Sequence, residues 1–126
     1  MNSKYEAVKG QYQRALQRLE DVLRQEKNEY IRDSAIKRFE FTFDLSWKFL
    51  KEFLEKDRGV ICASPKGCFR EAYRQGLFEY DDFWIEMTDM RNQTAHTYRE
   101  ETAEEIFNKL PAALEHFRLL LSAVKK

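Results

Sequence analysis

The chain has 126 residues, and 22 Lys and Arg are balanced by 22 Asp and Glu, so its formal net charge is zero. We expect residues 1–126 to form a single domain, because this length is close to that of an average domain. Zero net charge excludes a polybasic protein that is drawn to DNA or to a membrane by its overall field. The 43% hydrophobic and 14% aromatic content argues against disorder, and only 4 Gly and 2 Pro argue against a turn-rich β-sandwich or barrel. The composition therefore predicts a mostly helical domain that recognises its partners locally.

Two long amphipathic helices are predicted in the first half of the chain. In the first, apolar residues recur at steps of three and four from Tyr5 to Leu23. In the second, one apolar stripe runs from Ile36 to Leu54 with the same spacing. A second stripe at steps of four consists of Phe41, Leu45, Phe49 and Phe53. Two stripes indicate a helix that is buried on two sides, either as the central helix of a bundle or as one that also meets a second subunit.

A short third helix follows a break in the pattern. Gly59 can take the left-handed conformation that ends a helix, and Ser64 followed by proline is typical of an N-cap and first helical position. These signals predict a helix from Pro65 to Gln75, with Gly76 just past its end.

Two more helices complete the chain. The fourth should begin near Asp81 or Asp82, whose carboxylates suit free N–H groups, and run toward His96. The last should open with the capping box 102–105, Thr-Ala-Glu-Glu, and Pro111 should kink it near Phe107. The sequence therefore predicts an all-α, antiparallel four-helix up-and-down bundle with an additional short helix.

The two cysteines, Cys62 and Cys68, are six positions apart. No second cysteine pair and no suitably spaced histidine pair accompanies them, so the pattern favours neither a zinc site nor a disulfide scaffold. No basic and then apolar signal segment precedes Tyr5, so we expect a cytoplasmic protein with free thiols and without a metal or cofactor. The most apolar run, from Leu110 to Val124, contains charged side chains and predicts no membrane span.

One polar segment differs from the solvated helix faces. Residues 90–98 read Met-Arg-Asn-Gln-Thr-Ala-His-Thr-Tyr and place Arg91, Asn92, His96 and Tyr98 near the predicted end of the fourth helix. Side chains of these types bind phosphate, orient a base and transfer a proton. Arg91 and His96 are therefore the candidate catalytic residues.

The helical spacing refines these roles. In a regular helix, Asn92 and His96 share a face, so Asn92 could fix the tautomer of the imidazole. Arg91 would point about 140° away from His96, so one chain would not focus both groups on one atom, whereas two copies facing each other could. The negative end of the helix dipole would favour the imidazolium form of His96. His116, in the last helix, reads as a structural histidine.

Several blocks of the sequence together resemble the HEPN superfamily and, within it, the nucleotidyltransferase substrate-binding proteins. The blocks are Arg-Phe-Glu-Phe-Thr-Phe-Asp-Leu-Ser-Trp-Lys at 38–48, Ser-Pro-Lys at 64–66, Phe-Arg-Glu-Ala at 69–72, Gly-Leu at 76–77, the Arg91–Tyr98 segment and Glu-Thr-Ala at 101–103. The resemblance implies a four-helix bundle, a homodimer and a separate small nucleotidyltransferase as partner. It covers nearly the whole chain.

The resemblance also implies a chemistry. Related proteins in toxin–antitoxin pairs are metal-independent ribonucleases whose Arg-x4-His-x-Tyr motif lies at the dimer cleft, and their partner silences them by adenylylating the tyrosine. By position, Arg91 would bind the scissile phosphate and His96 would be the base or acid for attack by the RNA 2′-hydroxyl. Asn92 would orient these groups, and Tyr98 would be the modified residue.

Three functions remain open at this point. The first is a ribonuclease toxin that a nucleotidyltransferase neutralises. The second is a non-catalytic subunit that binds substrate or nucleotide for the nucleotidyltransferase. The third is a plain interaction bundle in which the polar cluster only caps the fourth helix.

Overall fold

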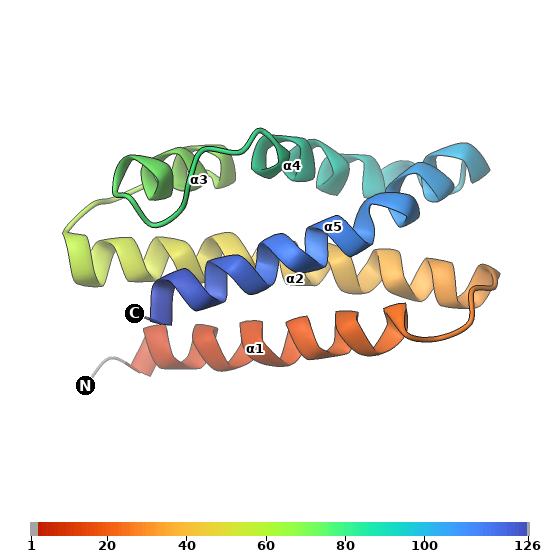
Figure 1. Cartoon of the computed structure of the whole chain (residues 1–126), viewed down its shortest axis with the longest axis horizontal. Coiled ribbons are helices and arrows are strands. Elements are labelled where there is room, and N and C mark those ends of the chain that lie inside the picture. The colour runs from red at the N-terminus through yellow and green to blue at the C-terminus, as the bar shows by residue number, and fades with distance from the viewer. Residues whose placement is uncertain (1–2, 126) are drawn as a thin grey trace.

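The computed structural model describes residues 3–125, and all regular structure in this range is helical (Figure 1). The elements are α1 (Ser3–Leu23), α2 (Glu29–Arg58), α3 (Pro65–Arg74), α4 (Phe83–Gln93), the 3₁₀ turn η1 (Thr94–His96) and α5 (Glu100–Lys125). Figure 1 shows that α1 and α2 run antiparallel, that α3 and α4 follow one another along α2, and that α5 returns across the bundle. The α3–α4 pair therefore takes the place of one long helix, and the predicted antiparallel bundle with an additional short helix is confirmed.

Glycines and short polar side chains end or begin α2 and α3 near the positions that the sequence predicts. Gly59 has φ 65° and ends α2, and Gly76 has φ 75° just after α3. The side chain of Ser64 accepts a hydrogen bond from the N–H of Gly67 at 3.1 Å, and Pro65 occupies the first turn. A cap that the sequence analysis did not identify, Asn28, accepts from the N–H of Ile31 at 2.8 Å and starts α2.

The start of α5 differs from the prediction. The helix begins at Glu100, and the N–H of Ala103 already donates to the carbonyl of Arg99 at 3.1 Å. Thr102 therefore lies within the first turn, and the predicted capping box is wrong. A charged contact explains the earlier start, because the buried guanidinium of Arg32 on α2 pairs with both Glu100 and Glu104. At the other end, α5 continues through Pro111 to Lys125.

Aromatic side chains form the centre of the bundle. Tyr12 is fully buried, stacks on Phe49 with ring centroids 5.3 Å apart, and donates a 2.7 Å hydrogen bond to the carbonyl of Phe117. Burial raises the pKa of the Tyr12 hydroxyl well above its ordinary value, so this donor stays protonated. The second stripe of α2 is covered only in part, because Phe49 is buried whereas Phe41 and Leu45 remain half-buried. No helix within residues 3–125 is long and apolar enough to cross a membrane.

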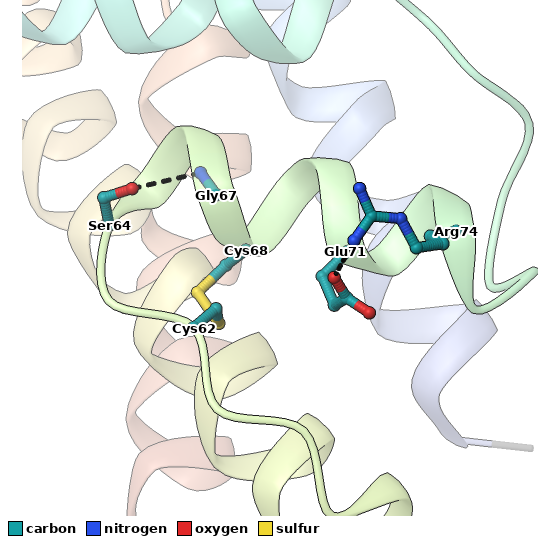
Figure 2. The surroundings of a disulfide bond; sticks show 6 residues. All are labelled: Cys62, Ser64, Gly67, Cys68, Glu71 and Arg74. Carbon is teal, nitrogen blue, oxygen red and sulfur yellow. Dashed lines mark hydrogen bonds and ion pairs between the residues drawn. A yellow bond between two sulfur atoms is a disulfide. The ribbon is translucent and has the colours of Figure 1, made fainter.

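The two cysteines correct a prediction. Cys62 and Cys68 are joined in a disulfide with their Cα atoms 5.2 Å apart, and Figure 2 shows the bond beside the N-cap of α3. The expectation of free thiols is therefore wrong. The chain between them turns at Ser64 and Pro65, which returns Cys68 to Cys62 at a distance that a disulfide spans. Two cysteines are too few for a scaffold of several bridges, but they suffice for one local bridge.

Candidate functional site

The polar segment lies where α4 changes into η1 before α5 begins. Regular α-helix ends at Gln93, and two threonine hydroxyls then bond to the backbone: Thr94 Oγ1 donates to the carbonyl of Arg91 at 2.7 Å and Thr97 Oγ1 to that of Thr94 at 3.3 Å. Hydroxyls that compete in this way for helix carbonyls favour a change of backbone geometry. The motif therefore occupies a helix junction rather than a continuous helix.

Arg91 is fixed by two carboxylates of α2. Its Nε and Nη2 atoms each donate to one oxygen of Asp44 at 3.0 Å, and Nη1 lies 3.1 Å from Glu40 Oε1. Nη1 also donates to Thr94 Oγ1 at 3.1 Å. The side chain is 29% exposed, and the pKa of Arg91 is raised chiefly by its hydrogen bond to Asp44. Arg91 is therefore a fixed cation at the edge of the bundle.

His96 and Tyr98 lie on the exposed side of the junction. His96 is exposed, and its ring meets that of Tyr98 edge to face with centroids 6.0 Å apart. Tyr98 is 76% exposed, and the guanidinium of Arg99 lies 5.6 Å from its ring centroid. Neither ring nitrogen of His96 has a hydrogen-bond partner within residues 3–125. The imidazole and the phenol are therefore both accessible to a reactant.

Asn92 does not have the predicted contact with His96. Asn92 is exposed, and no hydrogen bond joins it to His96 in the part of the chain that the structure describes. The prediction assumed a regular helix to His96, whereas the α-helical geometry ends at Gln93 and a tighter turn follows. An orienting role for Asn92 would therefore require a contact with a substrate or with a second copy.

The arrangement combines a fixed cation, an accessible imidazole and an accessible phenol. Such groups can stabilise a phosphate, transfer a proton and offer a hydroxyl for modification. Within residues 3–125, no group of three histidine, cysteine or acidic side chains is placed to hold a metal ion.

The two acids that hold Arg91 were missed by the sequence analysis. Glu40 and Asp44 are four residues apart on α2, so they share a face, and both fall within the 38–48 block. Acids at this spacing are typical of a solvated helix face, so the sequence pattern does not distinguish them from ordinary surface residues. The signal that could have found them is the proximity in space of α2 to the end of α4, and the sequence does not contain it.

His116 is held between α5 and the start of α4, in the structural role that the sequence indicates. Its Nδ1 lies 2.7 Å from the carbonyl oxygen of Ala112, and its Nε2 lies 2.7 Å from Asp81 Oδ2. The ring packs on Phe83 with centroids 4.6 Å apart. These contacts tie α5 to the start of α4, so His116 has a structural role.

Known proteins match both the sequence and the fold. The family model described as "Nucleotidyltransferase substrate binding protein like" matches residues 9–126. A Haemophilus influenzae protein named "Probable ribonuclease HepT" is 33% identical over 96 residues, which is 73% of this chain and 66% of that relative. The match thus spans just under two thirds of the length of the relative.

Two solved structures share the fold. A crystal structure of a protein from Thermus thermophilus superposes with a TM-score of 0.87 at 35% identity and covers 91% of this chain and 99% of that one. A Haemophilus influenzae structure, described as revealing the fold of a substrate binding domain of a nucleotidyltransferase, gives 0.71 at 27% identity and 97% of each chain. Together with the match over residues 9–126, these likenesses show that the chain belongs to the family of nucleotidyltransferase substrate-binding-like proteins.

Proposed function

We propose that this protein is a metal-independent endoribonuclease, the toxin-like half of a toxin–antitoxin pair whose other half is a small nucleotidyltransferase. The observation that carries the proposal is the exposed junction at which Arg91, His96 and Tyr98 lie within eight residues. The ribonuclease name of the Haemophilus influenzae relative supports it. We place the protein in the cytoplasm, where RNA and such a partner meet.

The reaction uses a nucleophile that RNA itself supplies. His96 accepts the proton of a ribose 2′-hydroxyl, the 2′-oxygen bonds to the adjacent phosphorus, and the 5′-oxygen leaves with a proton. The products are a 2′,3′-cyclic phosphate and a free 5′-hydroxyl. Arg91 stabilises the negative charge that develops on the phosphate oxygens.

A homodimer supplies what one chain lacks. One imidazole cannot at the same moment remove one proton and deliver another, whereas two copies that face each other bring two His96 side chains to one cleft. The half-buried Phe41 and Leu45 of α2 support such an interface, because a single chain leaves them partly uncovered.

The exposed phenol of Tyr98 is the proposed point of control. The nucleotidyltransferase transfers an adenylate from ATP to Tyr98 Oη and releases pyrophosphate. The adduct lies next to the imidazole, because the rings of His96 and Tyr98 are in contact. It therefore blocks the cleft by its bulk and by its negative charge.

The test is cleavage of single-stranded RNA in the presence of a chelator. We expect the wild-type chain to cleave and to leave cyclic phosphate ends, and Arg91→Ala and His96→Ala to lose cleavage while they remain dimeric in sedimentation. Arg74→Ala is the matched arginine control, because Arg74 pairs with Glu71 on α3 at 2.8 Å and the whole of α4 separates α3 from the junction along the chain. Cleavage that survives in both site variants would end this proposal.

A second candidate function is a non-catalytic subunit that binds substrate or nucleotide for the nucleotidyltransferase. One observation favours it: the charge of Arg91 is already matched by Asp44 and Glu40, as expected of a residue that only shapes a surface. This function predicts nucleotide transfer only when both proteins are mixed, and no cleavage of RNA at any protein concentration. Mass spectrometry of the mixture shows whether Tyr98 or another molecule gains the nucleotide.

A further inference from the structure

Three N–H groups of Arg91 donate hydrogen bonds within residues 3–125. A guanidinium has five N–H bonds. Nε and Nη2 donate to Asp44 at 3.0 Å, and Nη1 donates to Thr94 Oγ1 at 3.1 Å. Nη1 also faces Glu40 Oε1 at 3.1 Å. One N–H of Nη2 therefore has no partner within residues 3–125 and can meet a phosphate, while the contact of Nη1 with Glu40 is an ion pair without a hydrogen bond.

The charge around Arg91 is unusual for a phosphate site. Arg91 contributes one positive charge and the two acids contribute two negative charges, so the three side chains together are negative. Lys37 compensates Glu40 in part, because its Nζ lies 3.2 Å from Glu40 Oε2 although its side chain is 72% exposed. The acids are better covered, with 23% of the Glu40 and 36% of the Asp44 side chain exposed. Their repulsion of an incoming phosphate is therefore screened less than that of a fully exposed acid.

Two bonds to one carboxylate fix the plane of a guanidinium as well as its position. Asp44 is anchored in turn by the middle of α2, the longest helix of the bundle. The two-point bond to Asp44 and the ion pair with Glu40 therefore hold the guanidinium in one orientation, in which an N–H of Nη2 is left for a phosphate oxygen.

We propose that Asp44 is a positioning residue for Arg91, with Glu40 as a second anchor. The two acids raise the turnover number of the site and lower its affinity for RNA. This inference rests on the proposed ribonuclease function. Asp44 holds the guanidinium in the orientation that meets the charge of the transition state, and its own charge weakens the binding of the ground-state phosphate.

The informative variant is Asp44→Asn. Asparagine keeps one acceptor but turns an NH₂ group toward a donor of Arg91, so the two-point bond is lost together with one negative charge. We expect kcat to fall about tenfold or more, because the guanidinium is no longer fixed. We expect KM for RNA to fall about threefold, because a repulsive charge is gone. Glu40→Gln should change both constants in the same directions by smaller factors.

The matched control is Glu52→Gln. Glu52 also lies on α2, is 13% exposed and forms an ion pair with Lys4 at 3.3 Å, but it is two turns beyond Asp44. We expect its kcat and KM to match those of the wild-type chain. All rates are corrected for the folded fraction, since simple unfolding lowers kcat and leaves KM unchanged. A corrected kcat for Asp44→Asn within twofold of wild type, or a KM that rises, would overturn the inference.

A binding experiment separates this inference from the proposed function. The probe is a short RNA whose 2′-hydroxyls are methylated, so that it cannot be cleaved, and the readout is the ¹⁵N resonance of Arg91 Nε. We expect slow solvent exchange of this N–H in the wild-type chain, fast exchange in Asp44→Asn, and tighter binding of the probe by the variant. If the wild-type chain cleaves no RNA, the proposed function fails while these results still decide the role of Asp44. Equal exchange and equal affinity in both proteins would refute it.

Discussion

The two histidines of the chain occupy opposite environments. Both ring nitrogens of His116 face acceptors, the carbonyl of Ala112 and the carboxylate of Asp81, each at 2.7 Å. Both nitrogens are therefore occupied by contacts within the chain. His96 is exposed, and within residues 3–125 its imidazole has no hydrogen-bond partner and contacts the ring of Tyr98. The contacts of each imidazole, rather than the residue type, therefore indicate which histidine is available for proton transfer.

The largest effect should come from removing the accessible imidazole. His96→Ala should lower RNA cleavage by about 100-fold to 10,000-fold, the usual contribution of a general base or acid. Its free energy of unfolding should stay within about 0.5 kcal/mol of wild type, because the side chain packs against little. Urea unfolding beside the cleavage assay checks both. A strongly destabilised His96→Ala protein would contradict the conclusion that His96, unlike His116, does not support the fold.

The reverse pattern is expected at the other histidine. His116→Ala should lower the free energy of unfolding by about 2 kcal/mol, because Asp81 loses its partner and the packing against Phe83 is lost. Cleavage per folded molecule should not change. The measurement is urea unfolding together with an assay well below the thermal midpoint. Loss of cleavage in a fully folded His116→Ala protein would show that the distinction between the histidines is wrong.

The smallest effect concerns acid stability. The hydrogen bond from His116, followed by that from the N–H of Phe83, lowers the pKa of Asp81 below its ordinary value. A carboxylate whose pKa is lower in the folded than in the unfolded chain stabilises the fold above its unfolded pKa of about 3.9, and this contribution is lost as the pH falls through the folded pKa. Asp81 is 48% exposed, so screening limits the contribution to about 1 kcal/mol or less.

The check is urea unfolding from pH 6 to pH 2.5. Asp81→Asn should have a flatter stability profile than wild type over the acidic part of this range. Asp82→Asn is the control, because Asp82 is the next residue and has no contact with His116 among the described residues. Equal slopes for Asp81→Asn and wild type would show that the contact between His116 and Asp81 does not contribute to acid stability.

Most of the fold could be predicted because its signals are local. Apolar periodicity predicts the long helices, and Gly59 and the Ser64–Pro65 pair mark ends that depend on a few neighbouring residues. The start of α5 could not be predicted in this way. It depends on the contact of Arg32 with Glu100, 68 positions away, and that contact outweighs the local capping signal at Thr102.

The site was predictable to a smaller extent. The sequence identifies Arg91, His96 and Tyr98 as candidates, and the structure brings their segment to one exposed junction. The partners of Arg91 were not predictable, because the register of α2 against α4 is a property of the packed bundle. The disulfide of Cys62 was missed for a different reason, since its pairing depends on a turn of the chain and not on the number of cysteines.

The path of α5 has a practical consequence. Figure 1 shows the start of α1 and the end of α5 at the same end of the bundle, while α5 begins at the opposite end, next to the junction. A helix of 26 residues is about 39 Å long, so a tag or fused domain at the C-terminus is attached far from His96. Either terminus can therefore carry a label or a surface anchor while the junction remains open to the proposed RNA substrate and the proposed nucleotidyltransferase partner.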